Sequence, residues 1–171
     1  MPGRIIRTGR TVRLTNQQVG RAGELFVAAE IHRRGGYAVT FAGNMPGIDM
    51  LASDRDNTQR VSIQVKTKGP NSRSWQTSTR HGLSSQSVDS AVFAGRFWVL
   101  VDLRPTYPGF YVMPELWIRN DIYERHQEYL ALHGGHRPKN PASEHHGINV
   151  ARVADWQDAW NVLEIFASDD E

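Results

Sequence analysis

The sequence predicts an α/β fold, a single domain with a central mixed β-sheet flanked by helices. Its 171 residues suit one compact domain. Short segments rich in β-branched and aromatic residues alternate apolar and polar positions, as strands do. Segments with apolar residues at helical spacing lie before and after them, and this order is typical of helices packed around one sheet.

The first expected element is a helix that begins after Thr15 or Asn16, either of which can cap it, and runs to about Arg34. A glycine pair, Gly35-Gly36, follows the helix and favours its termination. The residues expected to form the apolar stripe of this helix are Ala22, Leu25, Phe26, Ala29 and Ile31.

Three strands are expected next, at residues 37–42, 48–52 and 60–68. A turn at residues 44–47 and a polar hairpin loop at 53–59 connect them. An irregular insertion, 69–96, with room for a short helix near 85–93, separates them from the second half of the domain. The elements expected there are strands 97–103 and 110–113, a helix 116–133, a loop 134–147, an extended piece 148–152 and a helix 155–166.

The composition excludes several classes of protein and indicates the domain limits. The chain has no cysteine, which excludes disulfides and cysteine-based zinc sites or nucleophiles. No apolar run approaches the ~20 residues of a membrane helix, and the N-terminus lacks the apolar core of a secretory signal, so we expect a cytoplasmic protein. The net charge of +2 is too small to indicate nucleic-acid binding. We expect a basic arm at 1–15, one domain at 16–166 and an acidic tail at 167–171.

The third strand carries the residues with the clearest chemical signal. Residues i and i+2 of a strand point to the same face, so Gln64 and Lys66 project together while Val65 enters the core. Asp49 follows the Pro46-Gly47 turn inside a short apolar segment, where burial of a carboxylate is costly unless it is paired or bound to metal. Counting outward from the 53–59 loop places Asp49 opposite Gln64.

Glu24 completes the expected site. Gly20 and Gly23 allow its helix to approach the sheet closely, which would bring Glu24 over the same edge. Oxygen ligands from Glu24, Asp49, the amide of Gln64 and the backbone carbonyl of Val65 suit Mg²⁺ or Mn²⁺. Such a metal can polarise a phosphate and activate water, and Lys66 can stabilise the developing charge. We therefore predict phosphodiester hydrolysis.

These segments resemble the PD-(D/E)XK, or restriction-endonuclease-like, nuclease superfamily. The resemblance rests on Glu24 after Gly20 and Gly23, on Pro46-Gly47-Ile48-Asp49, and on Gln64-Val65-Lys66, and it covers roughly residues 18–114. It implies an αβββαβ-type core, a divalent metal with no small-molecule cofactor, and DNA as substrate of an endodeoxyribonuclease. Many such nucleases pair to cut two strands, so a homodimer is compatible with it.

The sequence departs from the family pattern at Gln64, where an acid is commoner. An uncharged amide oxygen attracts a metal less strongly, which makes Glu24 more important. The alternative interpretation is therefore a catalytically inactive nuclease-like domain that binds DNA or protein in a defence or repair complex.

Two further groups of residues have side chains that can bind nucleic acid or metal. Basic and aromatic side chains in the insertion can hold a nucleic-acid backbone and stack a base, although Trp75 can equally cover the sheet edge. These predicted contacts are Lys68, Arg73, Trp75 and Arg80. The late histidines lack zinc-finger spacing, so an ordinary polar loop is favoured over zinc or an HNH-type nuclease. They are His126, His133, His136, His145 and His146.

Overall fold

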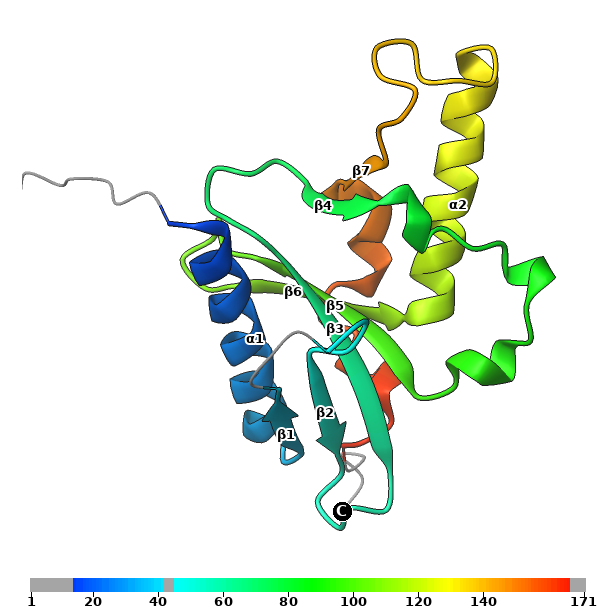
Figure 1. The fold of residues 1–171 in the computed structure, drawn as a ribbon. Coiled ribbons are helices and arrows are strands. Elements are labelled where there is room, and N and C mark those ends of the chain that lie inside the picture. The colour runs from blue at the N-terminus through cyan, green and yellow to red at the C-terminus, as the bar shows by residue number, and fades with distance from the viewer. Residues whose placement is uncertain (1–13, 42–44, 167–171) are drawn as a thin grey trace, which may run out of the picture.

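A computed structural model describes residues 14–41 and 45–166, and it confirms the α/β fold with a central mixed sheet (Figure 1). The predicted basic arm up to residue 13, part of the 44–47 turn and the acidic tail lie outside the described residues. Parallel pairing joins the third and fourth strands of the sheet, and all other neighbours are antiparallel. In spatial order the strands are β1 (Tyr37–Thr40), β2 (Met50–Ser53), β3 (Arg60–Lys68), β5 (Arg96–Asp102) and β6 (Gly109–Pro114).

Helix α1 (Asn16–Arg33) begins with a capping box, in which Thr15 accepts a hydrogen bond from the Gln18 amide and the Gln18 side chain accepts one from the Thr15 amide. The buried positions of the helix are Gly23, Val27 and Ile31. The predicted stripe was therefore wrong in part, because Leu25 and Phe26 are exposed. The helix is turned so that Gly23, which has no side chain, lies against β3.

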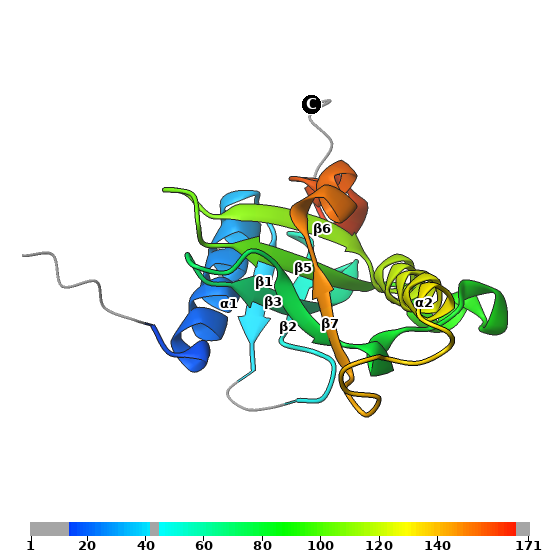
Figure 2. The ribbon, with the colours of Figure 1, turned by 90° about the horizontal axis from the view of Figure 1, so that it is seen from above.

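The sheet separates two apolar cores, and Figure 2 shows α1 and α2 (Glu115–Leu132) on its opposite sides. The first core lies beneath α1 and includes Val27, Ile31, Val61, Ile63, Val65, Val99 and Trp160. The second lies beneath α2 and includes Trp75, Trp98, Leu100, Met113, Ile118, Ile122 and Ile148. None of the helices in the described ranges is long and apolar enough to cross a membrane.

A second, two-stranded sheet was not predicted. It pairs β4 (Trp75–Ser78) with β7 (His145–Ile148) in antiparallel register and lies beside α2 (Figure 1). The expected short helix near residues 85–93 consists instead of two single 3₁₀ turns. The turns of the insertion are η1 (Thr79–His81), η2 (Ser85–Ser87) and η3 (Ser90–Phe93).

The predicted final helix was also wrong. Residues 150–163 form two 3₁₀ turns, η4 (Val150–Trp156) and η5 (Trp160–Leu163). Between them the Asp158 backbone has a φ of 51° and its amide donates to the Phe110 carbonyl at 2.9 Å, so the chain attaches to the edge of β6 and cannot continue a helix. Trp156 consequently packs against the second core and Trp160 lies in the first.

The contact of Gly23 with β3 sets how closely α1 approaches the sheet, and a pair of glycine substitutions tests it. A Cβ at Gly23 would lie 1.8 Å from Thr67 Oγ1, whereas a Cβ at Gly20 would meet nothing within 4 Å. We expect Gly23→Ala to lower the free energy of unfolding by about 1–3 kcal/mol through overpacking. Gly20→Ala, the matched control, should leave it unchanged or raise it by up to about 1 kcal/mol. Denaturant titration measures both, and equal effects of the two substitutions would contradict the close approach.

Candidate active site

Asp49 lies at the point where β2 begins, one position beyond the last paired residues of β2 and β3. That last pair is Met50 and Ile63, and the Asp49 amide donates to the Ile63 carbonyl at 2.9 Å. The Asp49 carboxylate accepts a hydrogen bond from the Gln64 Nε2 at 2.5 Å through its Oδ2 atom. The expectation that Asp49 lies opposite Gln64 is therefore confirmed.

The same carboxylate oxygen of Asp49 accepts the Val65 amide N–H at 2.6 Å. The backbone N–H and C=O groups of Ile63 and Val65 point toward β2, because those of alternate residues in a strand form hydrogen bonds to the same neighbouring strand. Because β2 pairing stops at Met50, Val65 would lose its partner there, and the Asp49 side chain replaces it. The Val65 carbonyl belongs to the same edge of β3, next to the Asp49 carboxylate.

The electrostatic surroundings make Asp49 an unusual carboxylate. Burial raises its pKa above the ordinary value, and the negative charge of Glu24 raises it further. The Val65 amide, the Lys66 ammonium and the Gln64 amide act in the opposite direction but do not outweigh burial. A half-buried carboxylate with a raised pKa is typical of functional sites.

Glu24 approaches the site from the other side of the sheet. It follows Gly23 in α1, on the face of the first core, while Gln64 and Lys66 lie on the face of the second core. Its carboxylate is partly exposed and forms an ion pair with Arg21 at 2.8 Å. Its negative charge acts on Asp49 and contributes to the raised pKa of that carboxyl group.

Lys66 lies over an aromatic ring beside Gln64. Its Nζ is 5.7 Å from the centre of the Trp98 ring, a cation–π distance, and Trp98 is the β5 partner of Gln64 in the register. Because Trp98 is buried, it gives the long Lys66 side chain a fixed surface to lie on.

His81 is a residue of this neighbourhood that the sequence did not identify as part of the site. Its ring lies edge-on to Trp98, with 5.3 Å between the ring centres. Burial lowers the pKa of His81, and the positive charges of Lys66 and Arg119 lower it further, so His81 is neutral at pH 7. No sequence signal places it there, because it belongs to a 3₁₀ turn of the irregular insertion.

One buried carboxylate fixes two arginines, of which Arg119 acts on His81 through its charge. The Glu115 carboxylate, which is almost fully buried, pairs with Arg96 and Arg119 at 2.7 Å each. Both guanidinium groups also lie over the Phe93 ring, at 5.5 and 5.7 Å from its centre. One carboxylate thus holds two cations in place, and this side of the site keeps an excess of positive charge.

Two of the predicted nucleic-acid contacts lie in the interior, which contradicts those predictions. Lys68 is 2% exposed, with its Nζ 3.0 Å from Asp102 Oδ2 and 3.9 Å from the centre of the Trp75 ring. Trp75 is fully buried and donates to the Val101 carbonyl at 2.8 Å, so it covers the sheet rather than stacking a base. Burial lowers the pKa of Lys68, and the bond to Asp102 offsets part of that effect.

The other two predicted contacts lie on the surface. Arg73 and Arg80 are exposed, and Arg80 forms an ion pair with Glu144 at 2.5 Å. Both remain accessible to a nucleic-acid backbone, and their role stays a prediction.

The donors around Asp49 fit a hard divalent cation. All four predicted ligands offer oxygen, from the Glu24 and Asp49 carboxylates, the Gln64 amide and the Val65 carbonyl, which is the chemistry that Mg²⁺ and Mn²⁺ prefer. Within residues 14–41 and 45–166, no three His, Asp or Glu side chains gather as a metal cluster. The site therefore has two carboxylates at most, supplemented by neutral oxygens.

No family model and no curated protein matches the sequence. Among solved structures, the bacterial homing endonuclease I-Ssp6803I is similar with a TM-score of 0.46 and 13% identity, over 88% of this chain and 92% of that chain. The Holliday junction resolvase Hjc of Archaeoglobus fulgidus is similar with a TM-score of 0.39 and 17% identity, over 80% of this chain and 95% of that chain. Neither likeness bears on the chemistry of this chain, so its function has to be inferred from its own side chains.

Asp49 should reduce stability when no metal is present. Its folded-state pKa is raised, so the folded protein holds the proton more tightly than the unfolded chain, and stability falls as the pH rises through the raised pKa. We expect Asp49→Asn, which keeps an oxygen for the Val65 amide, to match or exceed the wild-type melting temperature at pH 7 in EDTA. Its advantage should shrink as the pH falls toward about 4. Thermal melts of wild type and Asp49→Asn across this pH range measure the difference. A large loss of stability of Asp49→Asn at pH 7 would mean that the negative charge of Asp49 stabilises the fold.

Proposed function

We propose that this protein is a metal-dependent nuclease that hydrolyses DNA phosphodiester bonds. One observation carries the proposal: a half-buried carboxylate with a raised pKa, Asp49, contacts Gln64 where the pairing of β2 with β3 ends, with Lys66 on the same strand face as Gln64. The same residues carry the resemblance to the PD-(D/E)XK superfamily, in a variant with Gln-x-Lys.

Each residue has a distinct role in the proposed reaction. Asp49, Glu24, the Gln64 side-chain oxygen and the Val65 carbonyl would hold Mg²⁺ or Mn²⁺. When bound, the metal supplies Lewis acidity for the phosphate and lowers the pKa of a water molecule. The Lys66 ammonium stabilises negative charge on the attacking water or the phosphoryl oxygen, and Trp98 keeps that ammonium in place.

The Gln64 side chain can stabilise the proposed site both without and with a bound metal. Its Nε2 donates to Asp49, which a glutamate carboxylate at this position could not do. Rotation of the amide would exchange the nitrogen for the oxygen and present a neutral ligand beside the Asp49 carboxylate. The uncharged residue thus stabilises the empty site and still contributes to the filled one.

Neutral His81 and Lys66 both lie against the Trp98 ring. A neutral imidazole can donate one hydrogen bond and accept another. Together with Arg96 and Arg119, it makes this side of the site a favourable surface for a polyanion.

The test is cleavage of plasmid and branched DNA by the purified chain with Mg²⁺ or Mn²⁺. Wild type should cut, Asp49→Ala should lose detectable activity, and Lys66→Ala should lose a factor on the order of 10²–10³. Matched controls in the exposed β2–β3 loop, Asp56→Ala and Arg55→Ala, should cut as wild type. If wild type binds DNA without cutting and Mn²⁺ does not bind, the inactive, DNA-binding alternative holds instead.

Gln64→Glu should separate the two roles of this residue. Two adjacent carboxylates repel one another, and the hydrogen bond from Nε2 to Asp49 is lost, so the variant should melt below wild type in EDTA. Added Mn²⁺ should raise its melting temperature more than that of wild type, because the second negative charge strengthens metal binding. Melts with and without Mn²⁺ measure this, and a variant indifferent to Mn²⁺ would show that Gln64 does not face the metal.

A further inference from the structure

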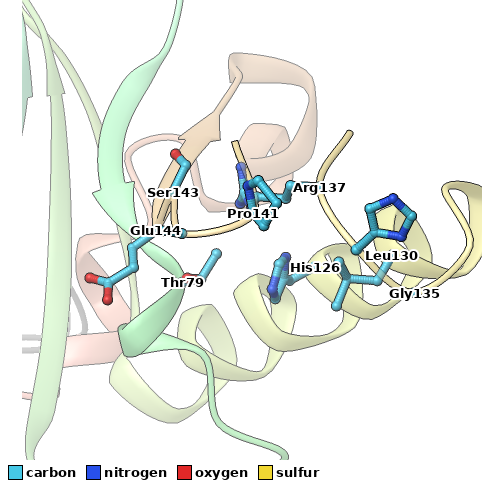
Figure 3. A pocket seen from close by; sticks show the side chains of 10 residues that line it. Thr79, His126, Leu130, Gly135, Arg137, Pro141, Ser143 and Glu144 are labelled. Atoms are coloured by element: carbon cyan, nitrogen blue, oxygen red, sulfur yellow. The ribbon is translucent and has the colours of Figure 1, made fainter. Parts of the chain in front are cut away.

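A pocket of about 410 Å³ lies between α2 and the loop that precedes β7 (Figure 3). None of the residues of the candidate active site lines it. Its volume lies within the range of about 300–1,000 Å³ that small-ligand sites occupy. The polar residues that line it are Thr79, His126, His136, Arg137, Ser143 and Glu144.

Two side chains of this pocket, those of His126 and Arg137, can donate hydrogen bonds to a ligand. The Nδ1 atom of His126 is buried and has no hydrogen-bond partner within residues 14–41 and 45–166, and Figure 3 shows its ring directed from α2 toward Arg137. The Arg137 guanidinium is held by a bond to the His145 carbonyl at 2.8 Å and lies 5.5 Å from the centre of the Tyr129 ring. These contacts leave other N–H groups of Arg137 free to bind a ligand.

The charge around the pocket is positive. Its one carboxylate, Glu144, pairs with Arg80 at 2.5 Å, and Figure 3 shows it directed away from His126. Arg137 also lines a neighbouring hollow of about 250 Å³ together with His133 and Lys139. A cation ligand is disfavoured, because the described part of the chain holds no group of three His, Asp or Glu side chains that could bind a metal.

We propose that this pocket binds a phosphate group, with Arg137 and His126 as its principal donors. Guanidinium and imidazolium groups form strong charge-assisted hydrogen bonds with phosphate oxygens, and the Thr79 and Ser143 hydroxyls can add neutral ones. The phosphate can belong to a free nucleotide or to the DNA backbone; the second case rests on the proposed nuclease function. In that case the pocket would hold the substrate at a point separate from the cutting site.

Binding should be coupled to protonation of His126. Burial lowers the pKa of His126 and the positive charge of Arg137 lowers it further, so the imidazole is neutral in the empty pocket at pH 7. An incoming anion offsets both effects and favours the charged imidazolium. The nearby His146 is buried, with a pKa lowered to about 4, and it accepts a bond from Arg152 at 3.0 Å, so it stays neutral. Glu144 remains paired with Arg80, and His136 is exposed.

The experiment measures binding of inorganic phosphate, of sulfate and of a short DNA duplex by calorimetry in EDTA at pH 6 and pH 8. Sulfate keeps its charge over this range, so tighter sulfate binding at pH 6 reports protonation of the protein. We expect Arg137→Ala to weaken binding by about tenfold or more, and His126→Gln to remove the pH dependence. The matched control Arg55→Ala, an equal loss of charge on an exposed loop, should bind the free anions as wild type does.

The His126 imidazole resonance provides an independent readout by NMR, assigned with His126→Gln. Its pKa should rise when sulfate saturates the protein. Binding of the free anions supports a nucleotide-type ligand. Binding of the duplex alone supports a backbone phosphate, provided that Arg137→Ala weakens it and His126→Gln removes its pH dependence. The proposal is overturned if none of the probes binds, or if both variants bind as wild type does. Cleavage by Asp49 variants is measured separately, so failure here leaves the proposed nuclease function standing.

Discussion

The strict alternation of side chains along β3 is the constraint on which the rest of the structure depends. Val61, Ile63 and Val65 enter the first core, so Gln64 and Lys66 must face the other way, toward Trp98. A shift of one residue in the pairing would place the polar side chains beneath α1 and the apolar ones beside the second core. The packing of the two apolar cores thus determines the face of the sheet on which Gln64 and Lys66 lie.

The early end of β2 pairing creates the site at a definite structural cost. Val65 loses the partner that a longer β2 would have provided, and the Asp49 carboxylate takes its place. That carboxylate is then half-buried beside Glu24, with a raised pKa, which is unfavourable for folding at neutral pH. The arrangement thus satisfies one backbone group at the cost of burying one charge.

Sequence patterns predicted what depends on neighbours along the chain. The alternation over residues 60–68 gave β3 its observed bounds, and the loop length placed Asp49 opposite Gln64. Lys68 continues that alternation, so nothing local distinguishes it from Lys66. Its burial depends on Asp102 and Trp75, which the parallel β5 and the distant β4–β7 pairing bring to it. Trp156 and Trp160 likewise have helical spacing, but attachment to the edge of β6 sends them to opposite faces of the sheet.

The neutral residue at position 64 follows from the same local geometry. Asp49 already accepts the Val65 amide, and a glutamate at position 64 would place a second negative charge beside it that has no N–H group to donate. Gln64 supplies that donor through its Nε2 atom, so the polar edge is satisfied whether or not the site is filled. The net charge of the ligand set then depends on Glu24, whose position depends on how closely Gly23 lets α1 approach Thr67. A contact within the helix–sheet interface would therefore govern how strongly the proposed site holds a cation.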